Sequence, residues 1–450
     1  MIVCKFGGTS IGDADAIRRA ADIVRSRLSQ GPIAVVSALG GSTNVLIDIA
    51  EQAARGQLIG AMSHVESVRD RHLVVAGNVL PGPEGDEIAL ELSALCDEIG
   101  ALAEALSTLG HLTPRSLDTV ASFGERMSSL LIAAAFNAMG VPAQLVDARR
   151  VMITDAQHTR AEPLTDAIAE AARVHLAPLV RDQKVPVMGG YIGATAGGIT
   201  TTLGRGGSDY SASLVGAALQ AEAIEIWTDV DGMMTADPRV VPSAKTIETV
   251  AFEEASELAS FGAKVLHPFT IAPAVRLGIP VRVLNSRRPE GTGTSITFDA
   301  PRRPVTAIAG KSNVTLVKVR SPRMLLTEGF LRELFAIFER HKMSVDVVST
   351  SEVSVSVTVD DAARLEETIG DLRQLGDVAV EQNRGIVALV GAALSESSGA
   401  MSRALACIGA ARLHMLSLSA TGINLTMVVD GDEVDALLRR LHAEFFEGKR

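Results

Sequence analysis

Short apolar runs alternate with amphipathic stretches along the first part of the chain. The runs "MIVCKF" (1–6) and "PIAVVSAL" (32–39) are typical of buried strands. Between them lies a stretch with the period of a helix, whose apolar residues are Ile17, Ala20, Ala21, Val24 and Leu28. A strand, a helix and a second strand in this order predict that the two strands pair in parallel.

The same alternation continues to about residue 300. Residues 45–140 have a mostly helical pattern. Beyond them, helices such as 209–221 alternate with three further apolar runs, "AQLVDA", "PVMGGYI" and "AIEIWTDV". Alternating strands and helices are typical of a parallel sheet covered by helices. The pattern therefore predicts one large α/β domain.

A segment rich in proline, glycine and charge, "NSRRPEGTGTSITFDAPRRP" (285–304), interrupts this rhythm. After it, strands and helices follow in the order βαββαβ, and from Gly385 the same order begins again. Two such units form an internal repeat. The second ends one strand short, so we expect its open edge to be covered by the neighbouring unit or by another subunit.

Composition narrows the classes of function. The 450 residues carry a formal net charge of −11, which argues against nucleic acid as the main partner, because neutralising phosphates needs a basic surface. The 3 cysteines lie far apart, so neither a zinc site nor a disulfide framework is expected, and a reducing cytoplasm suits them. No apolar segment approaches the roughly 20 residues that span a bilayer, and the N-terminus does not resemble a signal peptide. We expect a cytoplasmic protein without a membrane partner.

Three loops rich in glycine and hydroxyl groups follow apolar strands: "KFGGTS" (5–10), "SALGGSTN" (37–44) and "TTTLGRGGSD" (200–209). Loops after parallel strands gather at one edge of the sheet, where ligands bind. Glycines there let backbone N–H groups approach an anion. The pattern predicts a shared anion site, and the alternative is three unrelated turns with capping hydroxyls.

Single charged residues stand out in this setting. Lys5 ends its strand, where its ammonium can reach a phosphate, and Arg205 offers a planar guanidinium that matches a carboxylate. Asp209 opens the next helix, as a cap or as a ligand. Judged from the sequence pattern alone, Glu125 in "FGERMSS" (123–129) is an exposed helical acid or an ion-pair partner of Arg126.

Five motifs occur in one order: "KFGGTS", "SFGERMSS" (122–129), "TTTLGRGGSD", "WTDVDGMMTADPR" (227–239) and "FGAKVLHP" (261–268). Together they resemble the aspartate kinases, with the amino-acid-kinase fold followed by tandem ACT domains. No homoserine dehydrogenase half follows the repeats, as in the monofunctional type. The resemblance implies a mainly parallel open sheet sandwiched by helices in residues 1–300. It also implies two ferredoxin-like βαββαβ (ACT) domains, in residues 305–382 and 383–450.

The resemblance implies that ATP, accompanied by Mg²⁺, phosphorylates the side-chain carboxylate of L-aspartate to give 4-phospho-L-aspartate, the first step towards lysine, threonine and methionine. It assigns the catalytic roles to Lys5, Asp209 and Lys264. The implied aspartate-binding residues are Ser37, Thr43, Glu125, Arg205, Ser208 and Asp209. The implied nucleotide-binding residues are Lys5, Gly7, Gly8, Thr9, Thr228, Asp229, Met234, Arg239, Lys264 and Val265.

Two features of the sequence limit what can be assigned at the nucleotide site and for a metal. Relatives often carry tyrosine where this chain has Met234, so a thioether replaces any hydroxyl contact with the nucleotide. No cage of carboxylates is evident in the sequence, so we assign no metal ligand.

The first repeat resembles that of the lysine-sensitive aspartokinase III type. The resemblance implies a feedback site for lysine, with threonine as the alternative, in which acids meet the two ammonium groups of lysine. Its residues would be Met324, Phe330, Leu331, Ser344, Val345, Asp346, Ser351 and Glu352. Taken alone, Asp346 reads as a solvated turn acid and Glu352 as a strand-edge charge. Paired ACT units complete their sheets across subunits, so a homodimer or a dimer of dimers is expected.

Two other functions remain open at this stage. One is a kinase for another carboxylate, such as glutamate or acetylglutamate, against which "GERMSS" and the repeats argue. The other is an amino-acid sensor without catalytic activity, against which Lys5, Arg205, Asp209 and Lys264 argue.

Overall fold

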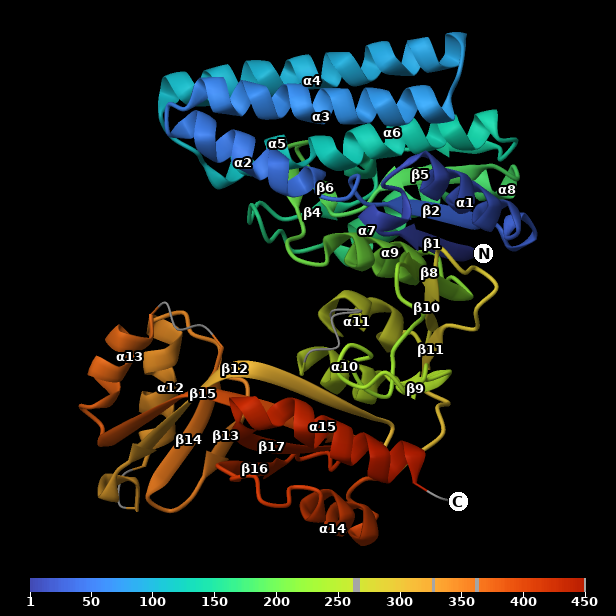
Figure 1. The fold of residues 1–450 in the computed structure, drawn as a ribbon. Helices are drawn as coiled ribbons and strands as arrows, with labels where there is room; N and C mark the ends of the chain where they lie inside the picture. The colour runs from blue at the N-terminus through green and yellow to red at the C-terminus, as the bar shows by residue number, and fades with distance from the viewer. Residues whose placement is uncertain (262–267, 326–327, 361–363, 449–450) are drawn as a thin grey trace. The chain divides into compact units, whose positions relative to one another are not determined.

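The computed structural model describes residues 1–261, 268–325, 328–360 and 364–448. By its internal contacts the chain divides into two compact units. The first unit comprises Met1–Met233 and Val265–Phe298, and the second comprises Met234–Lys264 and Asp299–Arg450. Figure 1 labels the helices and strands of both units.

The first unit is built on a mainly parallel sheet with strands in the order β3-β5-β2-β1-β8-β10-β11. Neighbouring strands run parallel, apart from the antiparallel pair β10 and β11. The strands are β1 (Ile2–Phe6), β2 (Pro32–Val36), β3 (Ala143–Leu145), β5 (Val185–Gly189), β8 (Ala223–Thr228), β10 (Val281–Asn285) and β11 (Thr294–Thr297). A smaller sheet holds β4 (Ile153–Thr154), β6 (Ile192–Thr195) and β7 (Thr200–Thr202). The mainly parallel open sheet predicted from the sequence is confirmed.

Helices cover both faces of the large sheet (Figure 1). On one face lie α1 (Ala14–Arg25) and α6 (Phe123–Ala138), with α2 (Ser42–Ala54), α3 (Leu58–Val79), α4 (Pro83–Leu109) and α5 (Pro114–Ala121) packed beyond them. On the other face lies α9 (Gly207–Ala218), which contacts α7 (Thr165–His175) and α11 (Pro268–Arg276); the short α8 (Ala177–Arg181) follows α7. The sheet is therefore the middle layer of a sandwich.

The first strand shows how this sandwich orients a polar side chain. Ile2, Cys4 and Phe6 belong to the hydrophobic core that the helices of the first face complete. Successive side chains of a strand point to opposite faces. Lys5 therefore points to the other face, where α9 begins, and its side chain contacts that helix.

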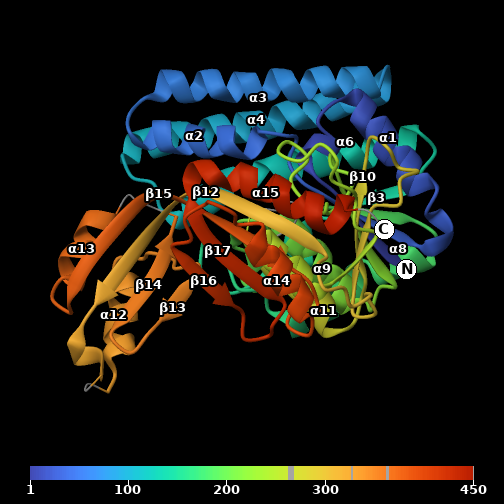
Figure 2. The same cartoon turned by 60° about the horizontal axis from the view of Figure 1, so that its bottom comes forward.

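The second unit contains one antiparallel sheet in the order β13-β14-β12-β15-β17-β16 (Figure 2). The strands are β12 (Ala307–Arg320), β13 (Val348–Thr350), β14 (Ser354–Val359), β15 (Asp377–Val390), β16 (Met415–Leu418) and β17 (Asn424–Asp430). The helices of the repeats are α12 (Phe330–Arg340), α13 (Leu365–Leu372), α14 (Ser398–Ala406) and α15 (Val434–His442). Each repeat buries its own hydrophobic cluster.

The two repeats share their longest strands, which corrects one expectation. Residues 314–320 of β12 pair with 377–384 of β15 in the first repeat, whereas Ala307–Lys311 pairs with Ile386–Val390 in the second. The strand that the second repeat lacks at its end is thus supplied from before the first repeat. Of the two alternatives predicted for this edge, the neighbouring unit covers it and another subunit does not, because strand order in a sheet need not follow chain order. The predicted boundary at 382/383 also differs, since residues 307–311 complete the second repeat.

The predicted limit of the first domain at residue 300 also differs from the structure. Residues 234–264, with β9 (Thr249–Ala251) and α10 (Phe252–Ser260), belong to the second unit. Ala236 and Val241 pack in the hydrophobic cluster of the second repeat. The buried carboxylate of Glu254 accepts hydrogen bonds from Thr306 Oγ1 at 2.5 Å and from the backbone N of Ala392 at 2.8 Å. Apolar burial and a satisfied buried acid together hold this segment to the repeats.

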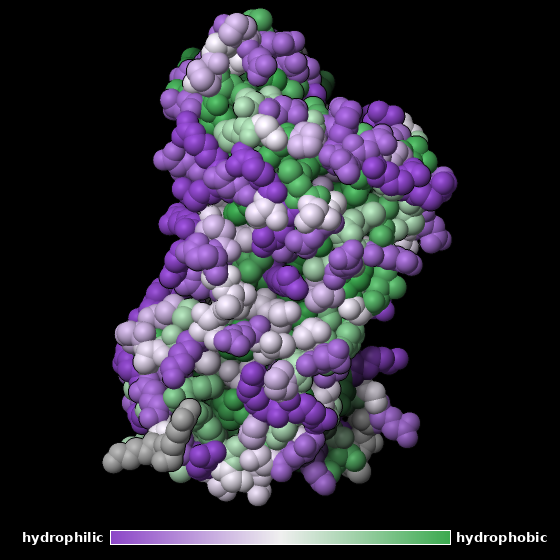
Figure 3. Space-filling model, turned by 90° about the vertical axis from the view of Figure 1, so that its right-hand side faces the viewer, coloured by the Kyte–Doolittle hydropathy of each residue, from purple (hydrophilic) through white to green (hydrophobic). Residues whose placement is uncertain are grey.

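No helix among the described residues is long and apolar enough to cross a bilayer. The face of the molecule in Figure 3 mixes hydrophilic and hydrophobic residues.

The role of residues 307–311 as an integral strand can be tested by Ile308→Ala. Ile308 is 2% exposed and lies in the core of the second repeat. Losing its side chain is expected to lower the free energy of unfolding by about 2–4 kcal/mol, because the cavity adds to the lost burial. Denaturant unfolding would measure this loss. Val348→Ala on the edge strand β13, where the side chain is 36% exposed, is the control. A loss for Ile308→Ala no larger than that of the control would contradict the assignment.

Candidate active site

The three glycine-rich loops meet in one cleft of the first unit, beyond the carboxyl ends of β1, β2 and β5. The cleft has a volume of about 570 Å³. Eight of the residues that the sequence proposed for the site line it: Lys5, Gly8, Ser37, Thr43, Glu125, Arg205, Ser208 and Asp209. Residues far apart in the sequence therefore converge where an open parallel sheet places its ligands.

Two glycines allow the segments around the cleft to come this close. A Cβ on Gly8 would lie 2.8 Å from the carbonyl oxygen of Ala38, and the carbonyl of Gly8 accepts a hydrogen bond from the N–H of Gly40 at 3.1 Å. A Cβ on Gly190 would lie 2.7 Å from Cα of Ser208. Side chains at these positions would push the loops apart and open the cleft.

Three helices begin at this cleft: α2, α6 and α9. The cleft is lined by Thr43 and Asn44 of α2, by Glu125 of α6, and by Gly207 and Ser208 of α9. A helix N-terminus carries a partial positive charge and unpaired N–H groups. The cleft therefore favours anions although the whole chain is acidic.

Lys5 and Asp209 form the central ion pair of the cleft. Lys5 Nζ lies 2.6 Å from Asp209 Oδ1, and both side chains are largely buried. Asp209 sits in the first turn of α9, so the pair joins the end of the first strand to the start of this helix. The pairing holds the ammonium at the cleft wall and leaves it able to meet a phosphate there.

Arg205 is the exposed cation of the cleft. It follows Gly204 and precedes Gly206 and Gly207, both of which also line the cleft. Among the residues that the structure describes, Arg205 has no ion-pair partner. Its guanidinium is thus available to bind a carboxylate with two hydrogen bonds.

Glu125 is buried at the base of the cleft, with 3% of its surface exposed. Its Oε1 accepts one hydrogen bond from the backbone N of Ala38 at 3.2 Å, whereas Oε2 has no partner among the described residues. Burial raises the pKa of this carboxyl to about 8. The alternatives of an exposed acid and of a pair with Arg126 are both wrong, because Arg126 pairs instead with Glu98 at 3.5 Å. A buried acid with one oxygen left without a partner at a cleft is suited to bind a cationic ligand.

Of the predicted nucleotide-binding residues, only Lys5 and Gly8 line the cleft among the residues that the structure describes. The N–H of Gly7 donates to the carbonyl of Trp227 at 3.1 Å, so this amide is already hydrogen-bonded within the chain. Thr9 follows Gly8 in the chain but does not line the cleft. Thr228 and Asp229 stand at the end of β8, where Thr228 Oγ1 donates to Asp229 Oδ1 at 3.3 Å. Met234 and Arg239 belong to the second unit. Lys264 and Val265 lie outside the described residues.

Sequence reasoning missed two residues of the cleft, Tyr191 and Ile47. The most informative is Tyr191, which has a positive φ of 60° and whose backbone N bonds to Ser211 Oγ at 3.0 Å. It packs against Gly207, where an added Cβ would lie 2.7 Å from its ring. The paired glycines before it, in "MGGY", were the available signal of a sharp turn. Ile47 of α2 was missed as well, whereas the remaining lining residues lie in two loops that the sequence assigned to the site: Ala38, Leu39, Gly40, Gly41, Asn44, Gly204, Gly206 and Gly207.

The predicted effector residues lie in the first repeat of the second unit. Asp346 is held by Lys311, whose Nζ lies 3.3 Å from Oδ2 and which also pairs with Asp360. Partial burial and the neighbouring Asp360 raise the pKa of the Asp346 carboxyl. Phe330 is buried in the core of the repeat, so its side chain is not available to a ligand. Met324 and Val345 pack against that core, whereas Leu331, Ser344, Ser351 and Glu352 are exposed.

The fold and the cleft define a class of phosphoryl-transfer enzymes that act on small amino acids, and comparison with known proteins agrees. Residues 1–285 match the sequence model of the amino acid kinase family. Lysine-sensitive aspartokinase 3 of Escherichia coli is 39% identical over 99% of either chain. The crystal structure of E. coli aspartokinase III with aspartate and ADP (R-state) superposes with a TM-score of 0.85, at 38% identity over 99% of this chain and 100% of that one. Its complex with lysine and aspartate (T-state) gives 0.84, at 38% identity over 99% of both chains. The chain belongs to the aspartokinases, a branch of the amino acid kinase family.

The raised pKa of Glu125 makes the stability of the unliganded protein depend on pH. Its folded-state pKa of about 8 lies above the ordinary value of 4.5, so the folded state retains a proton that the unfolded state loses. This contribution to stability is present below about 4.5 and is lost as pH rises towards about 8. Glu125→Gln cannot titrate, so it is expected to gain stability relative to the parent by on the order of a few kcal/mol across this range.

Thermal melts of the two proteins at a series of pH values would measure the difference. Glu98→Gln, at an exposed acid of α4, is the matched control and is expected to follow the parent. Parallel Tm curves for parent and Glu125→Gln would contradict the raised pKa.

Proposed function

We propose that this aspartokinase transfers the γ-phosphoryl group of ATP to the side-chain carboxylate of L-aspartate, with the residues of the described cleft in the roles given below. One observation carries the proposal: Lys5, Glu125 and Arg205, from three distant segments, line a single cleft. These are two cations and one buried acid, which is the set of charges that an amino acid and a phosphate require.

In this proposal Arg205 and Glu125 hold the backbone groups of aspartate. Arg205 binds the α-carboxylate through its planar guanidinium. Glu125 binds the α-ammonium, and binding of that cation favours the ionised form of the carboxyl, against the effect of burial. Ser37, Thr43 and Ser208 offer hydroxyl groups along the same wall. The side-chain carboxylate of aspartate would then point towards Lys5.

Lys5 and Asp209 would serve the transfer itself. A carboxylate that attacks a γ-phosphoryl group brings two anions together, so the reaction needs positive charge and in-line alignment. Lys5 supplies an ammonium that Asp209 fixes in place at 2.6 Å. Gly8 keeps the first loop close to the second, and the start of α9 adds its partial charge. A catalytic role is also proposed for Lys264, on the basis of the resemblance of its motif "FGAKVLHP" (261–268).

Mg²⁺ fits this cleft as a companion of ATP and not as a protein-held ion. The carboxylates that line the cleft are Glu125, which is buried, and Asp209, which is paired with Lys5. Among the described residues, no group of three or more His, Cys, Asp or Glu is arranged to hold a metal. When bound, Mg²⁺ would neutralise charge on the phosphates of ATP. Its main ligands would be phosphate oxygens and water molecules.

A feedback site for lysine in the first repeat is also proposed. Asp346 is the acid on which it depends, and Lys311 shows that an ammonium is accommodated beside that carboxylate. The E. coli relative has been crystallised with lysine, which supports lysine over threonine. A homodimer or dimer of dimers and a cytoplasmic location remain predictions of the same proposal.

Replacing Arg205 tests the reaction and the substrate together. Arg205→Ala is expected to raise the KM for aspartate by on the order of 30-fold or more, because a carboxylate loses its charged partner. Arg205→Lys is expected to recover only part of this loss, since an ammonium cannot bind bidentately. ADP release with aspartate, glutamate and acetylglutamate would be measured for each protein, with Arg173→Ala on α7 as the control.

Three outcomes would count against the proposal. Activity with glutamate or acetylglutamate but not aspartate would favour the other carboxylate kinases. No ADP release with any substrate, alongside tight lysine binding, would favour a sensor. An unchanged aspartate KM in Arg205→Ala would remove Arg205 from the site.

The effector proposal is tested by ligand-dependent melting. Lysine that binds the folded state at about 100 times its Kd is expected to add about 2.7 kcal/mol of stability and so to raise Tm. Asp346→Ala should abolish the rise, whereas Asp371→Ala, at an acid of α13 in the same repeat, should keep it. A rise in Tm with threonine alone would overturn the choice of lysine.

A further inference from the structure

One buried carboxylate of the first unit takes no part in the cleft. Asp118 lies in α5 and is 1% exposed. It does not line the cleft, and no motif of the sequence drew attention to it. A buried carboxylate is costly unless hydrogen bonds satisfy it. Its partners therefore indicate what it holds together.

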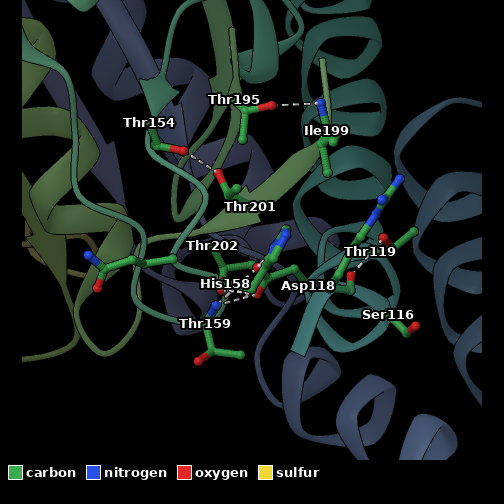
Figure 4. Close-up of polar contacts among 12 residues, drawn as sticks. Ser116, Asp118, Thr119, Thr154, His158, Thr159, Thr195, Ile199, Thr201 and Thr202 are labelled. Carbon is green, nitrogen blue, oxygen red and sulfur yellow. Dashed lines mark hydrogen bonds and ion pairs between the residues drawn. The ribbon is translucent and has the colours of Figure 1, made fainter. Parts of the chain in front are cut away.

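Asp118 accepts hydrogen bonds from two segments that are distant from α5 in the sequence (Figure 4). In the loop between β4 and α7, His158 Nδ1 lies 2.8 Å from Oδ2, and the backbone N of Thr159 lies 3.0 Å from both oxygens. On β7, Thr202 Oγ1 lies 2.6 Å from Oδ1. One side chain thus connects a helix, a loop and a strand.

The loop that Asp118 holds packs against the turn before Arg205. The carbonyl oxygen of Thr159 would lie 3.2 Å from a Cβ on Gly204, and the N–H of Ala161 donates to the carbonyl of Thr202 at 2.9 Å. Thr159 has a φ of 70°, a conformation that a β-branched residue rarely adopts. The carboxylate of Asp118 receives the N–H of this residue, so it supports the loop in its uncommon geometry.

The backbone connects Asp118 to Glu125 through two consecutive helices, α5 and α6. The helix α5 ends at Ala121, and the next residue, Ser122, donates through its Oγ to the carbonyl of Thr119 at 2.7 Å; α6 begins directly after Ser122. Glu125 stands in the first turn of α6. The backbone from α5 into α6 therefore connects Asp118 to Glu125, and the hydrogen bond to Thr202 connects it to the strand that leads to Arg205.

We propose that Asp118 is a positioning residue that sets the spacing between Glu125 and Arg205, and thereby the fit of the amino acid between them. The inference rests on the proposed function, in which these two side chains hold the α-ammonium and the α-carboxylate. Asp118 itself touches neither substrate. Its loss loosens the turn that carries Arg205, whereas the ion pair between Lys5 and Asp209 still holds the start of α9.

The matched pair of variants is Thr202→Val and Thr201→Val. Both threonines lie on β7 and both are buried, but Thr202 Oγ1 bonds to Asp118, whereas Thr201 Oγ1 bonds to Thr154 Oγ1 at 2.7 Å (Figure 4). Thr202→Val is expected to raise the KM for aspartate roughly tenfold, which corresponds to about 1.4 kcal/mol. Thr201→Val is expected to leave it within about twofold, since it does not touch Asp118. The KM for ATP and kcat should change little in either variant.

Asp118→Asn tests the carboxylate directly. An amide presents a donor where the N–H of Thr159 and the partners on the other side need acceptors, so the aspartate KM is expected to rise at least as far as in Thr202→Val. The double variant should show less than the sum of the two effects, because both remove the same connection. If Asp118→Asn does not fold, as judged by circular dichroism, Thr202→Val carries the test with Tyr191→Phe as a second control, because the Thr202 side chain is also hydrogen-bonded to Tyr191. An equal rise in the aspartate KM for Tyr191→Phe would overturn the role of Asp118.

The results separate this inference from the proposed function. A parent protein without aspartate-dependent ADP release would mean that the proposed function fails. An active parent in which Thr202→Val and Thr201→Val have the same aspartate KM would overturn the positioning role alone. Equal increases in the KM for aspartate and for ATP would also overturn it, since they would indicate a general loss of structure.

Discussion

The buried ion pair between Lys5 and Asp209 is the contact on which the organisation of the cleft depends. It joins the end of the first strand to the start of α9 on the face of the sheet opposite the main helical core. A largely buried ammonium needs an anionic partner, and a carboxylate at a helix start gains from the partial charge of that helix. The pair therefore places a cation at the wall of the cleft and fixes the helix whose first turn carries the remaining polar groups.

Two buried acids of the first unit show how environment separates two roles for the same functional group. Glu125 receives one backbone hydrogen bond, keeps one oxygen without a partner among the described residues, and has a pKa raised to about 8. Asp118, in the preceding helix α5, has both oxygens hydrogen-bonded to the chain itself. The unsatisfied acid is suited to a ligand, and the satisfied one is suited to holding segments together. Their proximity in the sequence links the two roles through α5 and α6.

The second unit depends on two long strands that belong to both repeats. Because β12 and β15 each run through the sheets of the first and the second repeat, neither repeat has a sheet of its own. Lys311 stands at the junction, at the end of the segment that pairs with the second repeat, and its ammonium reaches Asp346 of the first. The acid proposed for effector binding is thus placed where the two repeats meet.

The sequence by itself determined the local structure and the chemistry of the loops. The period of apolar residues was enough for the parallel sheet and its helices, and the glycine loops with Lys5 and Arg205 were enough for a shared cleft, because strand direction decides where such loops gather. Only the tertiary structure decided the features that depend on contacts between distant segments. The burial that raises the pKa of Glu125, the partners of Asp118, and the use of Gly7 N–H by Trp227 are of this kind. So is the return of residues 307–311 to complete the second repeat, since hydrophobic periodicity specifies that a strand forms but not which strand it pairs with.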